Sequence, residues 1–155
     1  MIAAVDTNIL IWWVRETATP GQEEMVKRAG WLFESFDEDE VEVMIASITL
    51  AEFLSGSDAK SRARERQVAE ESLIVQPFDA RASEKAAELW AIGRGLPEYR
   101  NERNVLKADL LIVAAAVTGG ASRIYSHDAK LRALARAAGL AALDLPTTAP
   151  HLFSD

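Results

Sequence analysis

Short apolar runs alternate with amphipathic segments along almost the whole chain, and this alternation constrains the fold more than any other feature. Runs of strand length are predicted at residues 1–5, 41–46, 73–78, 122–126 and 140–145. Helices are predicted between them, at residues 9–14, 22–36, 47–54, 58–71, 80–92, 105–118 and 129–138. Because strand–helix–strand units place successive strands parallel and stack helices on the sheet, we predict an α/β protein with a central, mostly parallel sheet.

The length of 155 residues suits one ordinary domain and is short for two, so residues 1–155 are expected to form a single domain. Apolar residues make up 49% of the chain and charged residues 26%, which excludes a disordered or fibrous protein. The longest apolar stretch, residues 110–117, is far shorter than the roughly 20 residues that cross a bilayer. With no secretory leader in the first thirty residues, we expect a cytoplasmic protein without a membrane segment.

Charge and cysteine content narrow the possible functions. The net charge of −7 disfavours a simple electrostatic clamp on nucleic acid. The absence of cysteine excludes disulfides, thiolate zinc sites, iron–sulfur clusters and a cysteine nucleophile. Any metal site must therefore be built from oxygen and imidazole ligands.

Acidic residues lie close to several predicted strand ends. Asp6 follows the first strand directly, Glu52 lies early in the helix after the second, and Asp128 follows the strand that ends near residue 126. The carboxyl ends of parallel strands border the functional crevice of such sheets, so these side chains are candidates for one site. Each also has a structural explanation, because Asp6 and Asp128 can cap helices and Thr49 with Glu52 fits a capping box. Taken singly, these residues do not decide between the two explanations.

Asp109 is a stronger candidate because it occupies the first turns of a very apolar helix. An ionised carboxylate against a buried surface needs a partner, and Lys107 points to another face of the helix. Several carboxylates in one crevice repel each other unless a cation neutralises them. Oxygen ligands favour Mg²⁺ or Mn²⁺, which suit phosphoryl chemistry.

Four blocks of sequence, in this order and spacing, resemble the PIN domain and more narrowly the VapC-type toxins of bacterial toxin–antitoxin pairs. They are residues 2–10 around Asp6-Thr7-Asn8, residues 47–53 around Glu52, residues 107–116 around Asp109, and residues 126–131 around Asp128. The resemblance spans residue 2 to about residue 145. It implies a three-layer α/β/α fold and a Mg²⁺- or Mn²⁺-dependent endoribonuclease.

The resemblance also implies roles for individual residues. It matches four acids to the family's metal ligands, namely Asp6, Glu52, Asp109 and Asp128. It matches Asn8 to an amide that holds a carboxylate in place, and Ser126 to a hydroxyl beside the metal site. It implies a homodimer, an RNA substrate and a small antitoxin that blocks the site. Two alternatives stay open, a nuclease of RNA maturation or DNA cleavage, and a non-catalytic module that uses the acidic cleft for docking.

Basic and aromatic residues suggest where a substrate could lie. Arg100, Arg103 and Lys107 precede Asp109 and are the better candidates for contacts with an RNA backbone. The arginines of residues 58–71 share their helix with glutamates and are expected to form a solvated face.

The remaining aromatic and histidine residues are expected to lie outside the site. Trp12 and Trp13 are expected in the core or at a dimer interface. His127 is expected in an exposed loop, and His151 in a C-terminal tail without a role in the site.

Overall fold

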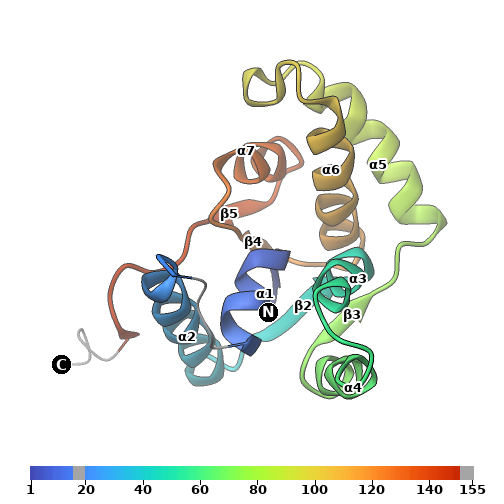
Figure 1. The fold of residues 1–155 in the computed structure, drawn as a ribbon. Coiled ribbons are helices and arrows are strands. Elements are labelled where there is room, and N and C mark those ends of the chain that lie inside the picture. The colour runs from blue at the N-terminus through green and yellow to red at the C-terminus, as the bar shows by residue number, and fades with distance from the viewer. Residues whose placement is uncertain (16–19, 151–155) are drawn as a thin grey trace.

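Five parallel strands form the centre of the protein (Figure 1). The structure is a computed structural model that describes residues 1–15 and 20–150, so His151 lies outside the described residues. The strands are β1 (Ile2–Val5), β2 (Glu42–Ala46), β3 (Ile74–Gln76), β4 (Arg123–Tyr125) and β5 (Ala141–Leu143). Their order in the sheet is β3-β2-β1-β4-β5, and every neighbouring pair is parallel. The predicted parallel sheet is thereby confirmed.

Helices connect the strands as the alternating pattern predicts. They are α1 (Thr7–Arg15), α2 (Glu23–Glu38), α3 (Ser47–Ser55), α4 (Arg62–Ser72), α5 (Ala80–Gly93), α6 (Arg103–Thr118) and α7 (Ala129–Ala137), with a short 3-10 turn, η1 (Pro97–Tyr99), between α5 and α6. Among the helices described, none combines the length and apolar character that a bilayer crossing requires.

Two boundaries differ from the prediction for local reasons. The helix expected from residue 58 begins at Arg62, because the Asp58 carboxylate accepts the backbone N–H groups of Lys60 and Ser61 in a turn. Strand β3 ends at Gln76, earlier than residue 78, because Pro77 has no N–H to donate to the sheet.

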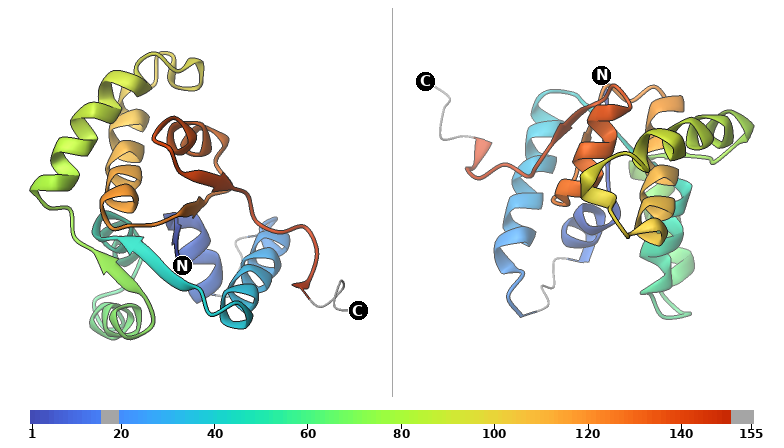
Figure 2. Two further views of the ribbon diagram at one scale, coloured as in Figure 1. Left: turned by 180° about the vertical axis from the view of Figure 1, so that it is seen from behind. Right: turned by 90° about the horizontal axis from the view of Figure 1, so that it is seen from above.

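Helices cover both faces of the sheet, which makes three layers (Figures 1 and 2). On one face, Ala3 and Val5 of β1 pack with residues of α1–α4 in a buried cluster. On the other face, Ala4 of β1 packs with residues of α5–α7 in a second cluster. Because successive side chains of a strand point to opposite faces, one apolar strand contributes to both cores. The predicted three-layer α/β/α fold is confirmed.

The order in which strands are added to the sheet reverses at β1, so β4 lies on the side of β1 opposite to β2. Strands β2 and β3 are added on one side of β1, and β4 and β5 on the other. Val5 pairs with Tyr125 at the carboxyl ends of these two strands, so Asp6 and Ser126 leave the sheet side by side. Such a reversal opens a crevice beyond the carboxyl ends of the strands, where α/β proteins bind their ligands.

Candidate active site

Four carboxylates line one pocket of about 130 Å³ at this crevice. They come from four different elements, and the lining residues are Asp6, Thr7, Asn8, Glu52, Asp109, Ile112, Asp128 and Leu131. The four acids singled out in the sequence are therefore brought together by the fold, although more than a hundred residues of chain separate the first from the last.

Asp6 is buried at the end of β1, with 5% of its surface exposed. Its Oδ1 accepts the backbone N–H of Ile9 at 3.1 Å, so it caps α1 as the structural explanation predicts. Its Oδ2 accepts the hydroxyl of Ser126. Burial raises the pKa of Asp6, with a further rise from the charge of Asp128, although these hydrogen bonds oppose the shift.

Ser126 is fully buried and links two of the acids. Its hydroxyl donates to Asp6, and its oxygen accepts the backbone N–H of Asp128 at 3.0 Å. The structure thus places this hydroxyl beside two of the carboxylates, and its role beside a metal stays a prediction.

Asp128 begins α7 and caps it. Its Oδ1 accepts the backbone N–H of Lys130 at 2.9 Å, yet the same side chain lines the pocket. Capping and site formation are therefore compatible at Asp128, as they are at Asp6.

Glu52 has a different role from the predicted capping box. Helix α3 begins at Ser47 with Ala46 as its N-cap, which places Thr49 inside the helix. The Glu52 carboxylate instead accepts the hydroxyl of Thr7 at 2.8 Å, a contact across 45 residues of sequence. The capping-box interpretation of Thr49 and Glu52 was therefore wrong, because the helix starts three residues earlier than it requires.

Asp109 receives a partner that the sequence analysis did not identify. The hydroxyl of Tyr99, a buried residue of η1, donates to Asp109 Oδ2 at 2.8 Å. Burial above all, together with the negative charges of the other three acids, raises the pKa of Asp109 to about 6, while the hydrogen bond from Tyr99 opposes the shift. The pKa of Tyr99 is raised too, by burial and by the negative charge of Asp109. Tyr99 was missed because it lies between the helices predicted at residues 80–92 and 105–118, and only the fold brings η1 against α6.

Asn8 lines the pocket and is exposed. Its backbone N–H helps to stabilise the Asp6 carboxylate, but none of the hydrogen bonds in the described part of the chain uses its side chain. The role of the Asn8 amide in holding a carboxylate therefore stays a prediction.

The chemistry of the pocket fits a divalent cation. Its charged lining consists of carboxylates alone, which are ligands for Mg²⁺ or Mn²⁺, and the raised pKa values of two of them reflect mutual repulsion and burial that a cation would relieve. Within the described residues, however, no three acidic, histidine or cysteine side chains are already arranged to hold one ion. Each carboxylate is instead bonded to a donor of the protein. Metal binding therefore requires at least one of these side chains to turn toward the others.

His127 lies between Ser126 and Asp128 in the sequence, but it is not among the residues that line the pocket. It is exposed, its Nδ1 lies 2.9 Å from Asp144 Oδ1, and its ring contacts Trp12 edge-on with the ring centres 6.0 Å apart. Although partial burial of Asp144 opposes it, hydrogen bonds from His127 and the backbone of Leu145 lower the pKa of Asp144. The expectation of an exposed loop histidine is confirmed.

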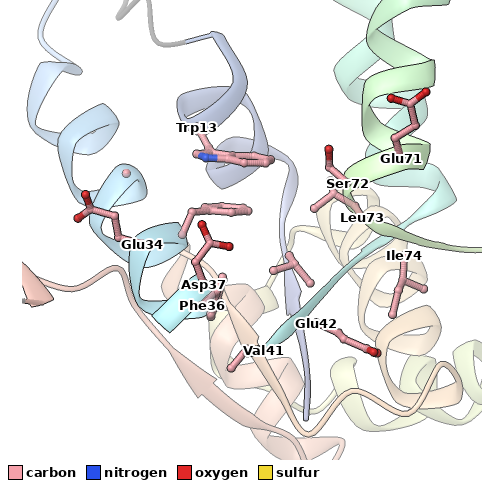
Figure 3. Close-up of a pocket in the computed structure, with 13 residues that line it drawn as sticks. Trp13, Glu34, Phe36, Asp37, Val41, Glu42, Glu71, Ser72, Leu73 and Ile74 are labelled. Atoms are coloured by element: carbon pink, nitrogen blue, oxygen red, sulfur yellow. The ribbon is translucent and has the colours of Figure 1, made fainter. Parts of the chain in front are cut away.

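A second hollow, of about 640 Å³, lies between α2 and the end of α4 (Figure 3). Its floor is apolar and includes Trp13, which stacks on Phe33 with ring centres 3.8 Å apart. Trp12 is buried, which confirms a core position for it, and Trp13 is half-buried and packs against the same core. We refer to the hollow as the acidic groove because its charged lining residues are all acids: Glu34, Asp37, Glu42 and Glu71.

Comparisons with known proteins agree with this architecture. Residues 3–137 match the PIN domain family. One similar solved structure is that of VapBC2 from Rickettsia felis bound to a DNA fragment from their promoter. The matched chain has 18% sequence identity and a TM-score of 0.64, and the match covers 94% of this chain and 100% of that chain, which shows a shared fold. Among curated proteins, none matches the sequence.

Proposed function

The chain belongs to the PIN domain family, whose members are nucleases, and we propose that it is a metal-dependent endoribonuclease of the VapC type, the toxin of a type II bacterial toxin–antitoxin pair. The observation that carries the proposal is the convergence of Asp6, Glu52, Asp109 and Asp128 on one pocket. The four sequence blocks that contain these acids are also the ones that resemble VapC-type toxins. The proposal places the activity in the cytoplasm, where cellular RNA is found.

We assign the four carboxylates as the residues that hold Mg²⁺ or Mn²⁺. When bound, the cation supplies positive charge for the phosphodiester and lowers the pKa of a water that hydrolyses it. Ser126 and the N–H of Ile9 fix the orientation of Asp6, and the N–H of Lys130 fixes that of Asp128. Such partners hold ligand groups in place and limit the reorganisation that binding requires.

Tyr99 and Thr7 keep the other two carboxylates in place. Tyr99 donates to Asp109, and Thr7 donates to Glu52, so neither charge is left without a donor at the pocket wall. Glu52 and Asp128 are both exposed, but a backbone N–H holds the Asp128 carboxylate, whereas the Thr7 hydroxyl that holds Glu52 can rotate, so Glu52 is the one best able to turn toward a bound ion. We infer that Asp6 and Asp128 form the fixed side of the site and Glu52 its adjustable side.

The test is cleavage of total cellular RNA by the purified protein with Mn²⁺ or Mg²⁺. We expect fragments that disappear with EDTA and with Asp6→Asn, while the variant keeps the circular dichroism spectrum of the wild type. A single-stranded DNA of the same sequence as a cleaved RNA tests the substrate class. Equal cleavage by wild type and variant would exclude the assigned site and favour a module that only docks partners.

We also propose a homodimer and an antitoxin partner. The acidic groove suits a partner segment in which Lys or Arg flank apolar side chains, because its floor is apolar and its charged lining is acidic (Figure 3). In the figure, Glu34 and Asp37 approach from α2 and Glu71 from α4, on opposite sides of the groove. A segment of this chemistry is what an antitoxin with a basic tail would offer.

Gly30 allows this docking to be tested. It lines the groove, and a Cβ at this position meets no atom within 4 Å, so a side chain can leave the helix here, and the indole of Gly30→Trp should occupy the groove. We expect the variant to fold and cleave RNA but to lose co-purification with the product of a short reading frame beside its gene. Retention of that partner by Gly30→Trp would exclude the groove as the docking site.

The proposed homodimer is tested separately, by measuring the molar mass of the protein alone with light scattering.

A further inference from the structure

An open hollow of about 960 Å³ lies at the junction between α5 and α6, and it shares no lining residue with the carboxylate pocket. Three of its lining residues are Arg94, Arg100 and Arg103, and it is termed the arginine hollow. Among the described residues, its one acidic lining residue is Glu102, which is bonded to the ammonium group of Lys130. Positive charge is thus concentrated here on a chain whose net charge is −7.

The arginines of this hollow have no carboxylate partners within residues 1–15 and 20–150. None of the ion pairs in this part of the chain involves Arg94, Arg100 or Arg103. Arg100 and Arg103 are exposed, and the Arg94 guanidinium lies 5.9 Å from the ring centre of Trp90. Cations gathered without counter-charges repel each other, and an anionic ligand relieves that repulsion.

The arginine hollow and the carboxylate pocket share a wall. Tyr99 lines the hollow, and its hydroxyl donates at 2.8 Å to Asp109, which lines the pocket. On the other side of η1, Glu102 bonds to Lys130, two residues after Asp128. The hollow is therefore next to the pocket that the four acids line.

We propose that the arginine hollow binds the sugar–phosphate backbone of single-stranded RNA beside the position of cleavage. This inference rests on the proposed nuclease function, because a strand of RNA must approach four carboxylates that repel it. Guanidinium groups bind phosphates through two parallel hydrogen bonds, and a positive groove that follows the backbone is typical of proteins that bind single strands. The Arg100 and Arg103 side chains offset the repulsion where the strand enters.

The test compares two double variants with the same change in charge. Arg100→Ala with Arg103→Ala removes the arginines of the hollow, and Arg64→Ala with Arg81→Ala is the control. Both control residues are exposed, and they lie on α4 and at the start of α5, away from the α5–α6 junction (Figure 1). The Kd for a fluorescent single-stranded RNA is measured by anisotropy in EDTA, so that the RNA stays intact, and at several salt concentrations.

We expect the hollow variant to weaken RNA binding by about tenfold or more and the control variant by less than about twofold. Losing two phosphate contacts on a single strand should reduce the slope of log Kd against log salt by about 1.4. In cleavage assays the hollow variant should raise KM with little change in kcat, because the lost contacts act on bound RNA before and during the reaction. Arg100→Lys with Arg103→Lys, which keeps the charge, should recover part of the affinity.

Several results would overturn the inference. Equal affinity of the hollow and control variants, or no binding of RNA by the wild type, would do so. A second contrary result would come from an oligoglutamate peptide that binds the wild type as tightly as RNA of equal charge does, and that no longer binds the hollow variant. This result would indicate that the hollow binds an acidic protein partner. If the wild type binds RNA through the hollow but does not cleave it with metal, the nuclease proposal fails and the binding site stands.

Discussion

At the scale of single residues, Asp6 and Asp128 show that capping a helix and forming a site are not competing roles. Each directs one carboxylate oxygen to a backbone N–H at the start of its helix. A helix N-terminus carries partial positive charge, which stabilises the ionised form of a carboxylate before any ligand binds. From the sequence the two roles look like alternatives, whereas in the fold the cap orients a side chain that also lines the pocket.

The raised pKa of Asp109 predicts a stability that depends on pH. A carboxyl with a pKa of about 6 in the folded chain and an ordinary value in the unfolded chain favours folding while it is protonated. This contribution is complete below the unfolded pKa of 3.8 and is lost as the pH rises through about 6. In EDTA, Asp109→Asn should therefore gain stability relative to the wild type between about pH 4 and pH 7.

Urea unfolding at both ends of this range measures the effect. Asp144→Asn is the control of opposite sign, because the lowered pKa of Asp144 means that its ionised form supports the fold, so this variant should be less stable than the wild type near pH 7. If the difference in the free energy of unfolding between Asp109→Asn and the wild type does not change with pH, the raised pKa assigned to Asp109 is contradicted.

Thr49 predicts a gain in stability from a conservative substitution. Its side chain is fully buried, and its hydroxyl has no hydrogen-bond partner in the described part of the chain. An unsatisfied buried hydroxyl costs about 1–3 kcal/mol, so Thr49→Val, of similar shape, should raise the free energy of unfolding by about 1 kcal/mol. Thr118→Val is the control, because the Thr118 hydroxyl donates to the Ala114 carbonyl at 2.9 Å. Equal effects of the two substitutions in urea unfolding would show that Thr49 is satisfied in solution.

Local rules for single residues predicted the site only in part. Asp6, Glu52, Asp109 and Asp128 were all identified as acids near strand ends or in an apolar helix, and the fold brings them to one pocket. Tyr99 was not identified, because its contact with Asp109 depends on how η1 packs against α6. A hydrogen bond set by tertiary packing has no local pattern that could reveal it.

At the scale of elements, two glycines in helices predict opposite effects of the same substitution. A Cβ added to Gly30 in α2 would meet no atom within 4 Å, so Gly30→Ala should stabilise the protein by about 0.5–1 kcal/mol through the helix propensity of alanine. Gly93 ends α5 against α6, where a Cβ would lie 2.4 Å from Leu106 Cδ1. Gly93→Ala should destabilise by about 1–3 kcal/mol, because the close packing of α5 on α6 leaves no room.

Thermal unfolding of the two variants measures this contrast. For a chain of this length, each kcal/mol shifts the Tm by about 2–4 °C, so the variants should move in opposite directions from the wild type by measurable amounts. The same direction of change in both would show that the spacing of α5 and α6 differs from that described.

The alternation of apolar runs was enough to predict the elements, because strands buried on both faces and helices buried on one face have different periods. Boundaries were less predictable where a side chain competes with the backbone, as at Asp58, or where proline removes a donor, as at Pro77. Sheet order was not predicted at all, since it depends on which strands pair across long stretches of sequence. That order places β4 beside β1 and so creates the site.

At the scale of the whole molecule, charge is divided among three surfaces with different chemistry. The carboxylate pocket and the acidic groove are negative, and the arginine hollow is positive. The net charge of −7 hides this division, which is why composition alone disfavoured a nucleic-acid ligand. The proposed cleavage of RNA at a negative pocket requires both a cation within it and positive charge beside it, and we propose the arginine hollow as the source of the second.

Metal binding should therefore be visible in the stability of the whole protein. A cation that binds only the folded chain stabilises it by about 2.7 kcal/mol at a concentration of 100 Kd, which corresponds to a rise in Tm of roughly 5–10 °C. Because the carboxyls must lose their protons to bind, and Asp109 has a pKa of about 6, the rise produced by Mn²⁺ should be larger near pH 7.5 than near pH 5.5. Asp109→Asn should abolish most of the rise, whereas Asp37→Asn, which changes an acid of the acidic groove, should keep it. A rise that is equal in both variants would place the bound cation elsewhere on the acidic surface.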